Sequence, residues 1–281
     1  MIEKPHTTVQ PKPDLLPTVD FFGRRLTRLV IGANPFGGFS HQSPARDAEM
    51  REYYTVTKIR ETWDRAEAAG VNVFITNNES PGVVDAVKQH LSAGTSMTWI
   101  TQVNCRLVPD MRTAIDEAVE VGCSALYFHG ALTDALYAER NGQQLAEWCE
   151  HARSHGIPVG VAAHAPEAHL WVDSLALVDF HAVCFFNCGS LHDGKGEKFH
   201  LADVPKAVAA IKAIRKPCIA YKIMGAGRID ARMAFEHAFD SIKPADLVNV
   251  GMHRGDNDRI VEDNVEIVRE ILARGGEEKS S

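Results

Sequence analysis

The chain has 281 residues, of which 45% are hydrophobic and 24% charged, and its net charge at pH 7 is −7. This composition is typical of a soluble globular protein and excludes a disordered chain, a collagen-like repeat and a small disulfide scaffold. The acidic balance argues against nucleic acid or an anionic membrane as a partner, because both bind basic surfaces.

The ends of the chain and its cysteines indicate the compartment. The opening residues MIEKPHTTVQPKPDLLP contain no apolar stretch of the kind that a secretion signal needs, and no run of 18 apolar residues occurs. The six cysteines lack Cys-x-x-Cys spacing, and most stand in apolar segments, which favours free thiols in reducing surroundings. We expect a cytoplasmic protein with an extended arm over residues 1–16 and a flexible tail over residues 276–281.

The segment VDFFGRRLTR predicts two short strands about a glycine turn, which would close the bottom of a barrel. From residue 28 onward, short apolar runs alternate with segments whose hydrophobicity repeats every three to four positions. The runs predict strands within residues 28–34, 71–77, 97–104, 124–130, 158–164, 181–187, 217–222 and 246–253. Because these runs are apolar nearly throughout, they match strands buried on both faces of a parallel sheet.

The segments between the strands predict amphipathic helices over residues 58–69, 82–92, 109–121, 143–155, 167–177, 204–214, 230–240 and 259–273. The stretch from Phe36 to Thr57 is expected to form an unusually long first loop. Eight strands and eight helices without a break in composition predict a single (β/α)8 TIM barrel over residues 17–275, preceded by the N-terminal β-hairpin. A doubly wound open sheet stays open as an alternative, because one sequence does not give strand order.

The predicted strands end in polar residues, and barrel enzymes place their chemistry at these C-terminal strand ends. The residue types are Asn, Gln, His and Lys rather than the Ser, Asp and Gly that turns prefer. A ring of such groups around one concave mouth predicts a site for a small-molecule substrate. The residues expected to bind substrate are Asn34, Asn77, Gln102, Asn187, Tyr221 and His253.

Lys222, His129 and His164 are the candidate catalytic residues. Lys222 follows the run PCIAY, where an apolar wall would lower the pKa of its ammonium group and make it a base or a Schiff-base nucleophile. The alternative is a lysine that reaches past the rim or pairs with Glu167 or Asp256. His164 precedes a helix start, so it is either an acid/base group or metal ligand, or a structural histidine beside that helix.

Two further kinds of site are compatible with the pattern. His129, His164 and His253 come from three strand ends and form a possible set of ligands for a divalent metal with an open position. No strand ends in Asp or Glu, and no His-x-His pair occurs, which argues against the metal. The loops GAGR and GMHRG predict a phosphate site near helix N-termini. Its residues are Gly225, Gly227, Arg228 and Arg254.

The order of these segments resembles the aldo-keto reductase superfamily over most of the chain. LTRLVIGANPFGG is similar to its first barrel strand, AAGVNVFITN to its second, ALYFHG to its fourth, and DRIVEDN to the segment that helps to hold the adenosine phosphate of NADP. The resemblance implies that His129 is an active-site histidine and that Tyr221 stacks on the nicotinamide. The family's Asp falls on Thr76, its Lys on Gln102, and Pro81 stands near the place of its Tyr, which implies a divergent member lacking this catalytic set.

We expect an enzyme, because the predicted strand ends bring acid/base groups together. The proton donor that hydride reduction needs is missing, which argues against an ordinary reductase. The leading hypothesis is a lyase or isomerase that acts by proton transfer on a small hydroxylated carbonyl compound, sugar-like and possibly phosphorylated. One alternative is an NAD(P)H-dependent reductase with altered catalytic residues. Another is a ligand-binding barrel without catalysis. The cofactor is open between a divalent metal, NADP and none, and a homo-oligomer is possible.

Overall fold

In the computed structural model, which describes residues 14–186 and 199–277, parallel strands close into a barrel. Each predicted apolar run supplies one strand, and every neighbouring pair in the barrel is parallel. In barrel order the strands are β10 (Leu247–Gly251), β3 (Leu29–Gly32), β4 (Val73–Asn77), β5 (Thr98–Val103), β6 (Ala125–Phe128), β7 (Val159–Ala163), β8 (Phe180–Cys184) and β9 (Cys218–Tyr221). The predicted (β/α)8 TIM barrel is confirmed, and the doubly wound alternative is wrong because β10 pairs with β3.

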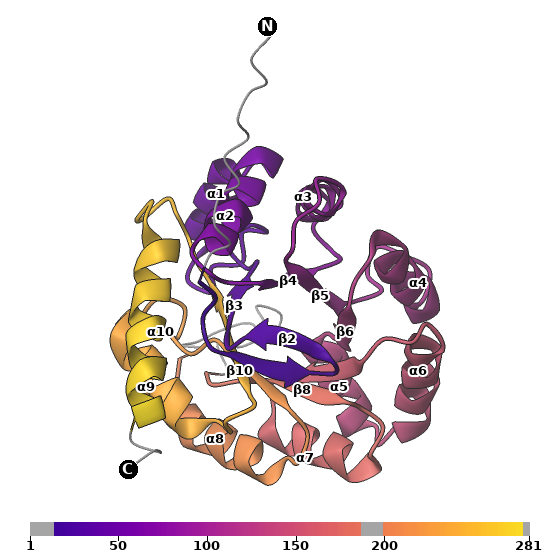
Figure 1. The fold of residues 1–281 in the computed structure, drawn as a ribbon. Coiled ribbons are helices and arrows are strands. Elements are labelled where there is room, and N and C mark those ends of the chain that lie inside the picture. Colours follow the sequence, from indigo (N-terminus) through magenta and orange to yellow (C-terminus); the bar gives the residue numbers. More distant parts are fainter. Residues whose placement is uncertain (1–13, 187–198, 278–281) are drawn as a thin grey trace, which may run out of the picture.

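The helices form a ring outside the strands, as Figure 1 shows. They are α1 (Pro44–Tyr53), α2 (Val56–Ala68), α3 (Pro81–Ser92), α4 (Met111–Val121), α5 (Gly130–Ala138), α6 (Gly142–Ser154), α7 (Pro166–Leu175), α8 (Asp203–Ala213), α9 (Ala231–Ser241) and α10 (Ile260–Glu277). Helix α10 continues past residue 275, where we expected the barrel to end.

Two helices, α1 and α5, were not predicted. The stretch expected as a long loop contains α1, which begins with Ser43 as its N-cap and Pro44 in its first turn. Met50 is the one buried residue of α1, so this helix lacks the apolar stripe on which sequence periodicity depends. Helix α5 follows His129 without a loop, and this brings its side chains close to the end of β6.

The hairpin of β1 (Thr18–Phe21) and β2 (Arg24–Thr27) lies across one end of the barrel, as predicted (Figure 1). Phe21 and Leu26 are buried, and both pack against the apolar side chains inside the barrel. The ring of Phe21 meets the ring of Phe180 edge to face at 5.2 Å. The hairpin therefore closes the N-terminal end of the barrel and leaves the opposite end for a site.

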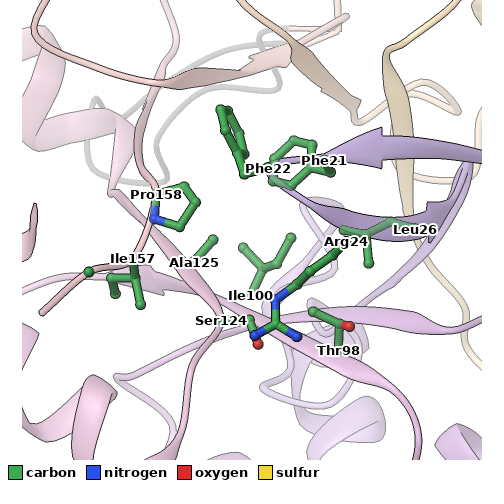
Figure 2. Close-up of a pocket in the computed structure, with 11 residues that line it drawn as sticks. Phe21, Phe22, Arg24, Leu26, Thr98, Ile100, Ser124, Ala125, Ile157 and Pro158 are labelled. Atoms are coloured by element: carbon green, nitrogen blue, oxygen red, sulfur yellow. The ribbon is translucent and has the colours of Figure 1, made fainter.

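A small cavity of about 150 Å³ remains beside the hairpin. Figure 2 shows Arg24 reaching toward Thr98 and Ser124, with Phe21 and Phe22 on the other side. Of the residues that line this cavity, Arg24 is the one that carries a charge. The cavity thus lacks a set of acid/base groups and is not the candidate active site.

The apolar core has two layers. The inner layer fills the barrel, and the larger outer layer lies between the strands and the surrounding helices. Leu16, in the part of the predicted arm that the structure describes, is buried, and its N–H donates to the carbonyl of Gly70. None of the helices described is both long and apolar enough to cross a membrane.

Candidate active site at the C-terminal mouth of the barrel

A cavity of about 340 Å³ opens at the C-terminal ends of the barrel strands. This is the size range of sites for small molecules. The structure brings most of the expected site residues to its wall, namely Asn34, Asn77, Gln102, His129, His164, Tyr221, Lys222, Gly227 and His253. Asn187, also expected to bind substrate, lies outside the described residues.

His164 is held by a carboxylate from an unpredicted helix. Asp134 of α5 accepts a hydrogen bond from Nδ1 of His164 at 2.7 Å and further bonds from the backbone N–H groups of His164 and Ala165. Burial alone would raise the pKa of Asp134, but these hydrogen bonds and the nearby imidazole outweigh it and hold the pKa below its usual value. The ionised carboxylate keeps the proton of neutral His164 on Nδ1, so Nε2 carries the lone pair of a base.

His129 has the opposite arrangement. It is the N-cap of α5, and its Nδ1 accepts a hydrogen bond from the N–H of Ala131 at 3.1 Å. In the neutral ring the proton is therefore on Nε2, which makes this nitrogen a donor. The rings of His129 and His164 lie 6.4 Å apart, so one cavity holds an imidazole base and an imidazole donor.

Lys222 lines the cavity in a strained backbone conformation. Its φ of 56° lies in the left-handed region, which non-glycine residues rarely adopt and which is concentrated at functional sites. Its Nζ is 5.7 Å from the centre of the Tyr221 ring. The side chain is only half-buried, so the expected full desolvation is not present. Among the ion pairs of the described residues, none joins Lys222 to Glu167 or Asp256.

Three residues expected to bind phosphate lie outside the cavity wall. Arg254 is 4% exposed, and its guanidinium donates to Glu61 at 2.9 Å and to Asp258 at 2.7 Å, on the side of α2. Arg228 donates to the carbonyl of Gly225 at 2.9 Å. Gly225 itself is packed so closely against an aromatic ring that a Cβ there would clash. Gly227 alone of the expected set borders the cavity, so a phosphate site built on these arginines is not supported.

The expected metal ligands are not grouped in the structure. Among the described residues, metal-ligating atoms come together in two other places, and neither contains His129 or His164. One of them joins His253 to Glu49 and Asp256 at the rim. There Arg46 already pairs with both carboxylates, so a cation occupies the position that a metal would need.

His253 is a buried residue of the cavity wall rather than a surface histidine. It is 5% exposed, and its ring lies against the rings of Tyr53 and Tyr54. Burial lowers the pKa of His253, which keeps the ring neutral. Both ring nitrogens are buried and lack a hydrogen-bond partner among the described residues.

The segment implied to hold NADP does not fit that role in this structure. Charged side chains of DRIVEDN already take part in ion pairs, one of which joins α10 to α2. These pairs are Asp258–Arg254, Glu262–Arg65 and Arg259–Asp263. The residues at the positions of the reductase Asp and Lys carry no charge. The hydroxyl of Thr76 accepts a hydrogen bond from the Trp99 indole at 2.9 Å, and Gln102 is a neutral amide. We derive no step through a nicotinamide.

Asp134 and Arg46 are the functional candidates that sequence reasoning missed. Asp134 stands in LTDALYA, where Leu132 and Leu136 are spaced four residues apart, as on one face of a helix. Ser43 followed by Pro44 is a helix-start pattern just before Arg46. Both helix signals were present but short.

Comparison with known proteins supports the fold. No family model and no curated protein matches the chain. A solved structure named "Putative aldo-keto reductase" from Pseudomonas aeruginosa matches with a TM-score of 0.65 at 16% identity, over 91% of this chain and 94% of that one. The chain shares the barrel fold of that structure. The resemblance in the order of the strands is thus borne out at the level of structure.

Other enzymes have the same architecture. Dihydropteroate synthase from Yersinia pestis matches with a TM-score of 0.54 at 11% identity, over 92% of this chain and 98% of that one. A truncated 3-deoxy-D-arabino-heptulosonate 7-phosphate synthase from Thermotoga maritima matches with a TM-score of 0.54 at 13% identity, over 93% of each chain. Barrels that catalyse different reactions are therefore similar to this chain, so the shared fold does not indicate a particular reaction.

Proposed function

We propose that this protein is a lyase or isomerase that moves a proton on a small hydroxylated carbonyl compound. The observation that carries the proposal is the pair of hydrogen bonds that favour opposite tautomers of two histidines in one cavity. His164, fixed by Asp134, presents a basic Nε2, whereas His129, fixed by the N–H of Ala131, presents a protonated Nε2. Proton transfer at a carbon next to a carbonyl needs one group of each kind.

The reaction uses these groups as follows. Nε2 of His164 removes the proton from the carbon next to the carbonyl, and Nε2–H of His129 donates its proton to the carbonyl oxygen as negative charge develops there. The ammonium of Lys222 stabilises that charge. Asn34 and Gln102 contact the hydroxyl groups of the substrate. In an isomerase the protonated His164 then gives its proton to the neighbouring carbon, and His129 takes back a proton from the hydroxyl group of the first carbon, which becomes the new carbonyl. In a lyase Nε2 of His164 instead removes the proton of the β-hydroxyl group, the bond between the α and β carbons breaks, and an aldehyde and the enediol are released.

Exchange of substrate hydrogen for deuterium tests this proposal. The protein is incubated in D2O with a panel of short aldoses and ketoses, with and without a terminal phosphate, and carbon-bound deuterium is followed by NMR. We expect His164→Gln to slow exchange by about 10²-fold or more, because positioned acid/base groups contribute about that much. His237→Gln, on the exposed face of α9, serves as the matched control. Equal exchange in the two variants would contradict the role of His164.

Asp134 is a positioning residue, and its test needs more than a loss of rate. In Asp134→Asn, Nδ1 of His164 no longer faces a carboxylate, so the acidic limb of the kcat/KM profile should move to a different pH as well as the rate falling. A variant with a lower rate but the wild-type pH profile would show that Asp134 acts only through packing.

Lys222 has a second possible role as a Schiff-base nucleophile, which requires contact between its Nζ and the carbonyl carbon. Borohydride with a candidate aldehyde would then leave a covalent adduct that mass spectrometry places on Lys222. An adduct that persists in Lys222→Ala, or no adduct with any active substrate, would leave the electrostatic role alone.

A reductase is the second candidate. The position of Tyr221 in the cavity wall favours it, whereas the ion pairs of the DRIVEDN side chains count against it. It predicts quenching of protein fluorescence on titration with NADPH and loss of that quenching in Tyr221→Ala. A barrel that only binds ligands predicts that the same mouth variants change affinity while no substrate is turned over or exchanged.

A further inference from the structure

A second group of ligating side chains lies on the outside of the barrel, far from the reactions proposed for the mouth. Helices α4 and α6 run side by side in the outer ring (Figure 1). His151 and His155 are one turn apart at the C-terminal end of α6, and Asp116 faces them from α4. The Nε2 atoms of His151 and His155 lie 2.7 Å and 2.8 Å from the same oxygen, Oδ1 of Asp116.

The geometry of this group resembles a ligand set that surrounds one point. Its three ligand atoms all lie within 4.8 Å of one another, and the two imidazole rings are almost perpendicular, at 89°. The side chains of His151, His155 and Asp116 are 18%, 30% and 52% exposed, so an ion can reach them from solvent. Both rings converge on a carboxylate oxygen, which shows that their Nε2 atoms already point inward.

We propose that His151, His155 and Asp116 bind a zinc ion between α4 and α6. Two imidazole nitrogens and one carboxylate oxygen suit Zn²⁺, whereas Ca²⁺ and Mg²⁺ prefer sets made of oxygen alone. The fourth tetrahedral position faces solvent and takes a water molecule. The site is separate from the metal set expected at the mouth, and it does not depend on the proposed proton transfer.

Zinc binding rearranges protons without an outside reactant. In the metal-free protein each neutral ring donates Nε2–H to Asp116, and in the zinc form each ring carries its proton on Nδ1 while Nε2 binds the metal. Arg112 opposes this change, because its guanidinium donates to Nδ1 of His151 at 3.3 Å and adds a positive charge. Removal of Arg112 should therefore strengthen zinc binding, which a nonspecific surface site would not predict.

The first experiment measures the affinity of the full-length protein for zinc alone, added as ZnCl2 in competition with a chromophoric chelator. We expect one zinc ion to bind here. His151→Ala and His155→Ala should each lower the affinity at least about tenfold, because even the loss of a group that only orients a ligand costs about that much. The matched control is His237→Ala, which removes an exposed histidine from α9 and should leave affinity unchanged. Circular dichroism confirms that each variant is folded.

Further variants separate this site from the rim. Arg112→Gln removes the opposing charge and offers an acceptor to Nδ1–H of His151, so zinc affinity should rise by up to about tenfold. His253→Ala should leave the measured affinity as in the wild type. Unchanged zinc binding in both His151→Ala and His155→Ala, loss of binding only in His253→Ala, or binding at millimolar zinc only would each overturn the proposal.

Discussion

His129 and His164 follow neighbouring strands and are the same residue type, yet their surroundings give them different chemistry. The carboxylate of Asp134 fixes one ring as a base, and the backbone N–H of Ala131 fixes the other as a donor. A third pattern occurs in the core, where Nδ1 of His169 and Nδ1 of His181 are 3.1 Å apart and both rings are buried. Burial lowers the pKa of His169 to about 4 and that of His181 well below its usual value, because it penalises the charged form.

This buried pair predicts a loss of stability in mild acid. The unfolded chain takes up protons on both histidines below about pH 6.5, whereas the folded chain does not until about pH 4, so stability is complete above that window and falls through it. The slope of the unfolding free energy should approach about 1.4 kcal/mol per pH unit for each histidine. Urea unfolding at a series of pH values measures it.

His169→Gln gives the comparison for that measurement. It removes one of these two protons, while His90 and His253, whose pKa values burial also lowers, still take up protons on unfolding. The slope between about pH 6.5 and pH 4 should therefore fall by up to about 1.4 kcal/mol per pH unit. Carboxylates with lowered pKa, such as Asp134, act only below this window, because their contribution is lost as they protonate. An unchanged slope in the variant would show that other groups cause the acid sensitivity.

At the level of elements, the strands are specified more completely than the helices. Each strand lies in a nearly continuous apolar run because both of its faces are buried. A glycine on β7 shows how closely the side chains inside the barrel are packed. A Cβ on Gly160 would come within 2.6 Å of the Phe180 ring, which is itself fully buried. The glycine therefore provides space for an aromatic side chain inside the barrel.

Gly160→Ala is accordingly expected to destabilise the protein by about 1–3 kcal/mol, because the Phe180 ring cannot move aside in a filled barrel. Gly82→Ala is the matched control, since nothing lies within 4 Å of its Cβ position at the start of α3. That substitution should be neutral or stabilising by up to about 1 kcal/mol, because alanine favours a helix. Thermal and urea unfolding distinguish the two, and equal stability in both variants would contradict tight packing at Gly160.

For the whole molecule, the hairpin determines which end of the barrel is open, and the charges at that end bear on the kind of substrate. The hairpin fills the N-terminal end with apolar side chains, while the C-terminal cavity is lined by apolar side chains together with the polar and charged ones of the strand ends. Three cationic residues, Arg46, Arg106 and Lys222, and two acids, Glu79 and Asp256, line the cavity, so 3 − 2 gives a net charge of +1. The chain as a whole carries −7. An acidic protein thus has a slightly basic mouth, which favours a carbonyl-bearing or anionic substrate.

Closure of the barrel by the hairpin can be tested with two adjacent phenylalanines. Phe21 is buried against Phe180, whereas Phe22 is 43% exposed. Phe21→Ala should cost about 3–5 kcal/mol of unfolding free energy, as is usual for a fully buried aromatic residue, and Phe22→Ala much less. Urea denaturation of the two variants measures the difference. Similar losses would mean that the hairpin contributes through its surface rather than as the closed end.

The sequence predicted the fold in detail but the site only in part. Burial of both strand faces leaves a local signal, so the barrel strands lie within the predicted runs, except that β8 begins one residue earlier, at Phe180. Asp134 was not predicted as a site residue, since its role depends on α5 folding back beside β7 after His129. Arg254 illustrates the reverse error: it follows a strand end, as a ligand-binding residue would, but its side chain turns toward Glu61 and Asp258. The direction of a side chain depends on partners that are distant in the chain.

The sequence by itself determined the number of barrel strands, their places along the chain, the closing hairpin and the polar residues at the strand ends, because these depend on patterns within short segments. Only the tertiary structure decided which nitrogen of each histidine is basic, which arginines are already paired, and which histidines on α6 meet a carboxylate from α4. Those properties come from hydrogen bonds and ion pairs of the folded chain, and several of these join residues far apart in the sequence, such as His164 with Asp134. Such distances leave no periodic pattern in a sequence.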